Sequence, residues 1–191
     1  MNYGLPTKLE IRGTEWAIRY DFRCVLEICA AMEDPELDKQ DKAFVAMTIL
    51  YPDFPEIPAA DYEEALKQCF RFIDGGEDHM GQKGPKLVSW EQDIRHIIAP
   101  VNRVLGQEVR SIPYDPDENT GGLHWWTFLS AYMEIGDCVF AQIVRIRNLL
   151  AKGKPLDKAD REWYRQNRHL VDIRQTFSEV EDDLLKQWGA K

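Results

Sequence analysis

The chain has 191 residues, of which 44% are hydrophobic and 30% are charged, and its formal net charge is −9. This length favours a single domain whose core needs no disulfide or metal for stability, and the acidic balance disfavours nucleic-acid binding, which depends on neutralising phosphates. No apolar run approaches the roughly 20 residues that span a membrane. The four cysteines lie in apolar helical patterns, which is typical of reduced, buried thiols in the cytoplasm.

The pattern of apolar residues predicts a mostly α fold, a compact helical domain with a small N-terminal β-hairpin. Alternating apolar positions on both sides of Gly13-Thr14 predict the hairpin, and we expect strands only within about Lys8–Arg19. One domain should cover residues 1–191, with the hairpin arm at 1–19, loops at 75–88 and 107–122, and an amphipathic helix at 176–191.

Helix-capping signals recur along the rest of the chain. Asp21 and Asp157 are placed to cap helices, another helix should run from about Asp38 to Tyr51, and capping boxes are predicted at Asp61–Glu64 and Ser89–Gln92. A proline inside the helix after Ser89 should kink that helix. Further helices are expected from about Leu123 and from Asp137 to a stop at Gly153, and the inner face of the helix after Asp38 should carry Phe44, Val45, Met47 and Thr48.

The segment LHWWTFLSAYMEIGD, from Leu123 to Asp137, places two tryptophans side by side. Adjacent helical positions point about 100° apart, so we expect the two rings to face different environments. A helix with so wide an apolar face is either central in its own domain or shared with a partner. We expect one tryptophan in the core and the other at an interface, with Trp126 as the core member; the partner-binding candidates here are Trp125, Trp126, Phe128 and Tyr132.

A basic stretch interrupts the acidic chain, because residues 141–175 carry nine lysines and arginines against four acidic residues. Arg161, Arg165 and Arg168 are spaced to form one helical stripe, with Arg145 and Arg147 upstream. Two interpretations stay open: a solvated face paired with nearby carboxylates, or a docking surface for an acidic or helical protein partner.

Patterns that would indicate catalysis or ligand binding are incomplete. In GGEDHMGQKG, Gln82 stands where a phosphate-binding loop needs lysine, and DPDENTG lacks the final bidentate glutamate of a calcium loop. The four histidines are scattered without metal-ligand spacing. We therefore expect a protein that is not an enzyme and needs neither cofactor nor metal.

Three stretches together resemble a small tail-gene protein family of long-tailed phages and prophages of Gram-positive bacteria, encoded near the tape-measure gene. They are Leu123-His-Trp-Trp-Thr-Phe128, Ile135-Gly-Asp137 and Ile143-Val-Arg-Ile-Arg147; Trp90–Asp93 and Lys158–Arg165 match the family's layout. Two features depart from the pattern: Pro100 falls where an unbroken helix is expected, and the loop after Gly106 is long.

The resemblance implies a role in tail assembly, usually that of a tail assembly chaperone. Such proteins keep the tape-measure protein soluble in the host cytoplasm, help tail tube subunits assemble around it, and are absent from the mature virion. The implied partners are therefore the tape-measure protein, the tail tube protein or a second copy of the chain, rather than nucleic acid or a membrane. The alternative is a structural virion component, such as a head–tail connector or minor tail protein.

Overall fold

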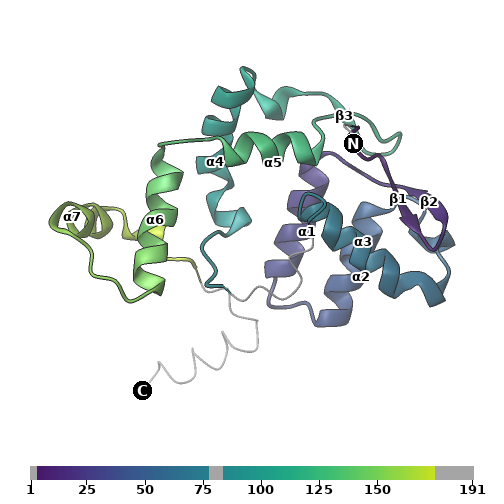
Figure 1. Cartoon of the computed structure of the whole chain (residues 1–191), viewed down its shortest axis with the longest axis horizontal. Helices are drawn as coiled ribbons and strands as arrows, with labels where there is room; N and C mark the ends of the chain where they lie inside the picture. Colours follow the sequence, from purple (N-terminus) through teal and green to yellow (C-terminus); the bar gives the residue numbers. More distant parts are fainter. Residues whose placement is uncertain (1–3, 78–83, 175–191) are drawn as a thin grey trace.

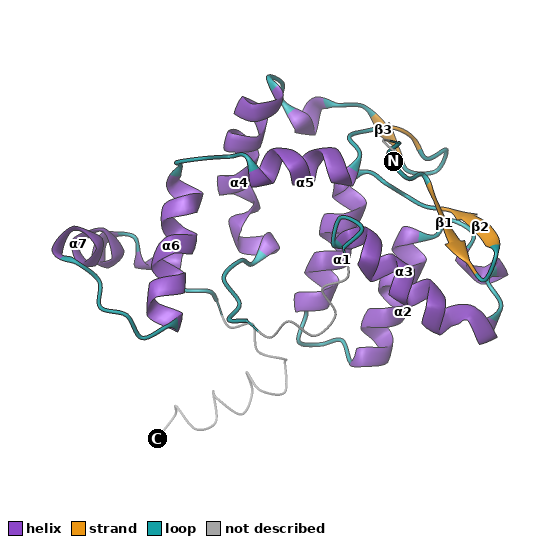
Figure 2. Ribbon diagram, in the orientation of Figure 1, coloured by secondary structure: helices purple, strands orange, loops and turns teal. Residues whose placement is uncertain are grey.

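The computed structural model describes residues 4–77 and 84–174, and over these residues the chain is mostly helical, as predicted (Figures 1 and 2). Eight α-helices, three short 3₁₀ segments and two small β-hairpins are present in this part of the chain. No helix among the described residues is long and apolar enough to cross a membrane.

The predicted N-terminal hairpin is confirmed. Strands β1 (Lys8–Ile11) and β2 (Thr14–Ala17) pair antiparallel, with Ile11 opposite Thr14. Arg12 and Gly13 both have positive φ, 49° and 85°, as a tight hairpin turn that follows the twist of its strands requires. The buried Ile11 side chain fixes the hairpin to the core.

Helices α1 (Phe22–Glu33), α2 (Lys39–Leu50) and α3 (Tyr62–Ile73) pack beside this hairpin (Figure 1). The capping prediction for Asp21 is confirmed, and Asp38, near which a helix was expected to begin, also caps its helix: both carboxylates accept backbone N–H groups of the first helical turn. The predicted inner face of α2 is wrong at two positions. Phe44 is exposed and packs edge-on against Phe54, in the 3₁₀ segment Phe54–Glu56. Thr48 is also exposed, and its hydroxyl donates to the Phe44 carbonyl of the same helix. The buried residues of α2 are Ala46, Met47 and Leu50.

The two predicted capping boxes are wrong, because tertiary partners take the side chains. Asp61 ends the 3₁₀ segment Ala59–Asp61 and pairs with Arg12 of the hairpin at 3.1 Å. Ser89 precedes α4 (Trp90–Leu105), but its hydroxyl donates to Glu33 of α1. The backbone N–H of Ser89 donates to the carboxylate of Asp93, four positions on, rather than to Gln92 as a capping box requires.

A second hairpin lies in the segment 107–122, where a loop was expected. The prediction that strands occur only within about Lys8–Arg19 is therefore wrong. After the 3₁₀ segment Val109–Ser111, β3 (Tyr114–Asp115) pairs with β4 (Thr120–Gly121). The Asp115 carboxylate accepts the N–H groups of the next turn, and this local closure brings the two short strands together.

The remaining helices run from the centre of the molecule to the end farthest from β1 and β2 (Figure 1). They are α5 (Trp125–Met133), α6 (Val139–Ala151), α7 (Lys158–Gln166) and α8 (Arg168–Val171). Asp157 caps α7 as predicted, whereas α6 starts after Cys138 rather than at Asp137. Because α7 ends before Arg168, the expected arginine stripe is divided between two helices. The expected helix at 176–191 lies outside the described residues.

Candidate functional site

The two tryptophans of α5 bind the C-terminal end of another helix. The indole N–H of Trp125 donates to the Ile73 carbonyl at 2.8 Å, and that of Trp126 donates to the Phe72 carbonyl at 2.9 Å. Both carbonyls belong to the last turn of α3, where the regular helical N–H donors run out, although the Phe72 carbonyl also accepts the N–H of Gly75 at 3.1 Å. The tandem tryptophans therefore act as a side-chain cap for α3.

The burial of the two rings reverses the expectation that Trp126 is the core member. Trp125 is 1% exposed and packs against Trp90 and Phe128, whereas Trp126 is half-buried. Trp126 stacks on Phe72 and covers Gly76, where a Cβ would come within 3.0 Å of the ring. Both indoles thus lie against one helix end, which the 100° step between their backbone positions did not reveal.

The start of α5 is held against the start of α1. His124 caps α5 through Nδ1, which accepts the N–H of Trp126 at 3.0 Å, so the ring proton is on Nε2 and donates to the Pro6 carbonyl at 2.9 Å. The Asp21 carboxylate accepts the N–H of Leu123 at 2.7 Å as well as capping α1. Burial lowers the pKa of His124, so the neutral ring that this cap requires is favoured.

A cleft opens where α5 meets the end of α3 and the start of α4. We call it the α5 cleft; its volume is about 410 Å³, and its apolar lining includes Ile73, Trp90, Leu129 and Met133. Met133 is 75% exposed, the highest value among the large hydrophobic residues described as exposed. The remaining lining residues are Cys29, Asp74, Gly75, Glu77, Trp125 and Ser130.

The one thiol in the α5 cleft lining, Cys29, is poorly suited to nucleophilic chemistry. Burial, aided by the charges of Glu33 and Asp74, raises the pKa of Cys29 to about 12, so the thiol stays protonated at neutral pH. Among the described residues, no group of three or more histidine, cysteine or acidic side chains is arranged to hold a metal ion.

The other α5 candidates contribute more to packing than to the surface. Phe128 is fully buried and stacks between Phe22 and Trp125. Tyr132 is half-buried and packs against Trp90 and Phe140. The exposed part of this helix is therefore the side that carries Met133.

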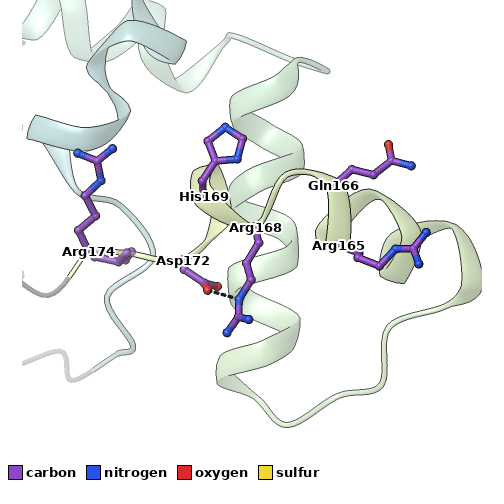
Figure 3. A pocket seen from close by; sticks show the side chains of 7 residues that line it. Arg165, Gln166, Arg168, His169, Asp172 and Arg174 are labelled. Atoms are coloured by element: carbon purple, nitrogen blue, oxygen red, sulfur yellow. Dashed lines mark hydrogen bonds and ion pairs between the residues drawn. The ribbon is translucent and has the colours of Figure 1, made fainter. Parts of the chain in front are cut away.

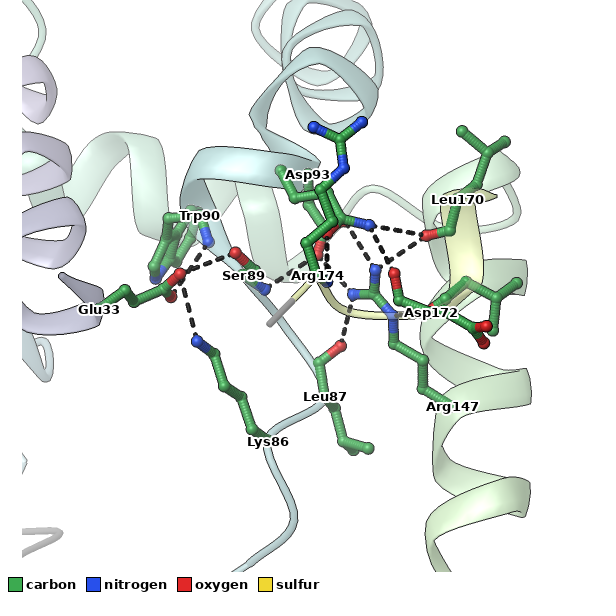
Figure 4. A network of polar contacts seen from close by, with 12 residues as sticks. Glu33, Lys86, Leu87, Ser89, Trp90, Asp93, Arg147, Leu170, Asp172 and Arg174 are labelled. Carbon is green, nitrogen blue, oxygen red and sulfur yellow. Dashed lines mark hydrogen bonds and ion pairs between the residues drawn. The ribbon is translucent and has the colours of Figure 1, made fainter. Parts of the chain in front are cut away.

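The arginine candidates occupy different environments. Arg147 is buried and pairs with Asp93 of α4 (Figure 4). The other four lie on the surface with local partners: Arg145 pairs with Asp160, Arg165 with Glu162 and Arg168 with Asp172, while Arg161 donates to the Asp157 carbonyl.

A shallow basic hollow lies between α7 and the end of the described chain. Figure 3 shows Arg165, Arg168, His169 and Arg174 around it, with Asp172 bound to Arg168. The intramolecular pairing fits the first interpretation of the basic stretch, a solvated face matched by local acids.

Sequence reasoning missed Asp93, the buried partner of Arg147. One signal was present: Asp93 precedes the buried Ile97 and Val101 at spacings of four and eight, so it lies on the apolar face of α4. A carboxylate at such a position requires a buried cation or several donors.

The family model described as Bacteriophage Gp15 protein matches residues 1–173 of the chain. The chain belongs to this bacteriophage protein family. In this Gp15 family protein, the match covers nearly all described residues, including the tandem tryptophans and both members of the Arg147–Asp93 pair. Comparison with functionally curated proteins and with solved structures gives no match.

Proposed function

We propose that this Gp15 family chain is a non-enzymatic tail assembly protein, acting as a tail assembly chaperone that binds the tape-measure protein, the tail tube protein or both. It would do so in the cytoplasm of a Gram-positive host and be absent from the mature virion. Membership of a bacteriophage protein family supports a structural or assembly role. The chaperone role follows from the sequence resemblance and remains the proposal.

The observation that carries this proposal is the α5 cleft. Solvent-exposed apolar surface next to a packed core is typical of a protein-binding site. Its lining offers side chains for hydrophobic contact, while its thiol is protonated at neutral pH. These properties suit a protein that binds another chain better than one that transforms a small substrate.

Co-expression with the tape-measure protein of the same phage tests the proposal. We expect the soluble fraction of the tape-measure protein to rise when this chain is present and the two to co-purify. Mass spectrometry of purified particles gives the second measurement, and the chain should be absent from them. Stoichiometric recovery of the chain in mature particles would instead support a head–tail connector or minor tail protein.

A further inference from the structure

We propose that copies of this chain associate head to tail, with the basic end of one copy against the acidic end of the next. The proposal goes beyond the proposed function, because it concerns contacts between copies and does not depend on which tail protein the chain binds. Three observations carry it: a group of exposed cations at one end of the molecule, a group of exposed carboxylates at the other, and the separation of the two along the longest axis.

The basic end comprises the end of α6, the loop that follows it and the start of α7, at the end of the molecule farthest from β1 and β2 (Figure 1). No acidic residue occurs in the sequence between Asp137 and Asp157. The exposed cations of this end are Lys152, Lys154, Lys158 and Arg161.

Contacts within the chain do not neutralise the basic end. Asp160 pairs with Arg145, and the Asp157 carboxylate caps α7 by accepting the N–H of Asp160. Arg161 donates to the Asp157 carbonyl rather than to a carboxylate, and none of the three lysines forms an ion pair with another described residue. Four cations therefore stand against the single carboxylate of Asp157, and this surface is positive.

The acidic end is formed by β1, the 3₁₀ segment Phe54–Glu56 and the start of α3 (Figure 1). The sequence between Lys42 and Lys67 has five acidic residues and no basic one. The exposed carboxylates of this end that form no ion pair with a described residue are Glu10, Asp53, Glu56 and Glu63.

Basic side chains beside the acidic end are too few to cancel its charge. Glu10, Glu63 and Glu64 line a hollow of about 630 Å³ together with Arg12 and Arg71. Arg12 is already paired with the carboxylate of the nearby 3₁₀ segment Ala59–Asp61, and Arg71 donates to a backbone carbonyl. Three glutamates thus face one uncompensated arginine in this hollow, and the surface is negative.

Each end also carries an exposed apolar side chain beside its charges. Leu150, two residues before Lys152, is 40% exposed, and Phe44, which packs against Phe54 next to Asp53, is 58% exposed. Protein interfaces combine apolar contacts with a polar rim, and opposite charges on that rim steer the two surfaces together. The two ends therefore complement each other in charge, and each offers an apolar contact.

The positions of the two ends favour contacts between copies. They lie at opposite ends of the longest axis and so cannot meet within one copy (Figure 1). Two ends of the same sign repel, which disfavours a twofold dimer through either end. An acidic partner protein would satisfy the basic end alone, and nucleic acid would be repelled by the net charge of −9. A second copy satisfies both ends and extends into a chain or ring of copies.

Sedimentation velocity of the full-length chain at rising protein concentration tests the proposal. At about 0.05 M salt the average mass should grow with concentration, and about 0.5 M salt should lower the association constant at least about tenfold, because exposed charges are then screened. A chain that stays monomeric at low salt, or association that salt does not weaken, would overturn the proposal.

Charge reversals locate the contact. The double variant Lys154→Glu, Lys158→Glu changes the basic end, and Lys39→Glu, Arg95→Glu is its control, with the same change in net charge on exposed residues outside both ends. The first variant should lower the association constant at least about tenfold, and the control at most about threefold. Equal effects of the two would contradict the assignment.

A complementary variant makes the test independent of folding. Asp53→Lys, Glu63→Lys changes exposed residues of the acidic end, and alone it should lose association as the basic-end variant does. Mixing the two variants should restore complexes that contain both, because one keeps an intact acidic end and the other an intact basic end. If the mixture stays monomeric, the two ends do not bind each other and the proposal fails.

Two outcomes would show a different occupant of the basic end and overturn the proposal. Residues 179–183 carry four carboxylates; if their replacement by amides abolishes association while Asp53→Lys, Glu63→Lys does not, this segment is the occupant. If the chain stays monomeric and only the basic-end variant fails to bind the tape-measure protein, that protein is the occupant and the proposed function stands. Self-association without binding to either tail protein would instead support this proposal and reject the proposed function.

Discussion

Replacement of Arg147 by methionine should destabilise the fold strongly, because this side chain joins four parts of the chain. Its guanidinium donates to both carboxylate oxygens of Asp93, at 2.5 and 3.0 Å, and to the carbonyls of Leu87, Leu170 and Val171 at 2.6 to 2.9 Å. Figure 4 shows how these contacts connect α6 to the start of α4 and to the segment around α8. The side chains of Arg147 and Asp93 are 4% and 0% exposed.

The magnitude follows from what Arg147→Met leaves behind. Removing one member of a buried ion pair typically costs about 3–5 kcal/mol, because the remaining charge is buried without compensation. Against a typical domain stability of about 5–15 kcal/mol, this is roughly a fifth or more of the free energy of unfolding. Arg147→Lys should be intermediate, since lysine keeps the charge but cannot reproduce the planar, two-pronged bond to Asp93.

Urea denaturation followed by circular dichroism measures these losses. The control is Arg165→Met, because Arg165 has a 76% exposed side chain in a surface pair with Glu162, and its removal should be nearly neutral. The double variant Arg147→Met, Asp93→Asn removes the buried charge and keeps an acceptor for the Ser89 N–H, so it should be more stable than Arg147→Met alone. If Arg147→Met costs no more than Arg165→Met, the pair does not hold the helices together as inferred.

Three further changes test the environment of α5. In thermal melts, Trp125→Phe should lower stability more than Trp126→Phe. Each variant loses a hydrogen bond to α3 worth about 0.5–1.5 kcal/mol, but only Trp125→Phe also leaves a cavity in the core. Equal losses would contradict this. Gly122→Ala should destabilise more than Gly153→Ala, because both glycines have positive φ but only at Gly122 would a Cβ clash, 2.3 Å from the Asp21 carboxylate. Because burial lowers the pKa of His124, the unfolded chain binds the proton first, and stability should fall as the pH drops below about 6.5. His124→Asn keeps a capping side chain without this titration, so urea midpoints between pH 7 and 5 should change less steeply than in wild type; an unchanged slope would exclude the assigned role.

Local chemistry made part of the fold predictable. The caps at Asp21 and Asp157 depend on one side chain and the helix that follows it, and both were predicted correctly. The hairpin turn at Gly13 is equally local, because its positive φ is encoded where it occurs.

Competition from distant groups accounts for the elements that sequence reasoning misjudged. Asp61 and Ser89 are good capping residues, yet Arg12 and Glu33 bind their side chains instead. These partners lie 49 and 56 positions away, and no local pattern identifies them. The capping residues Asp61 and Ser89 thus located the starts of α3 and α4 correctly, but the partners of their side chains depended on tertiary packing.

The tandem tryptophans show the same limit within the candidate site. Their spacing predicted two environments, but it could not reveal that the end of α3 lies within reach of both indoles. Gly75 and Gly76 at that end have positive φ and lie in close contact with Leu129 and Trp126, which needs residues without a Cβ. The contact therefore depends on both segments, which are about fifty residues apart.

One helix end serves both the core and the α5 cleft. The Ile73 carbonyl accepts the indole N–H of Trp125, and Ile73 also lines the cleft beside Met133. A variant that removes this hydrogen bond, such as Trp125→Phe, should therefore weaken partner binding only together with stability. Met133→Lys should weaken binding at unchanged stability, because Met133 contributes to the wall of the cleft and not to the core. Measuring the melting temperature of both variants and their co-purification with the tape-measure protein separates the helix cap from the proposed binding surface, although the two share a residue.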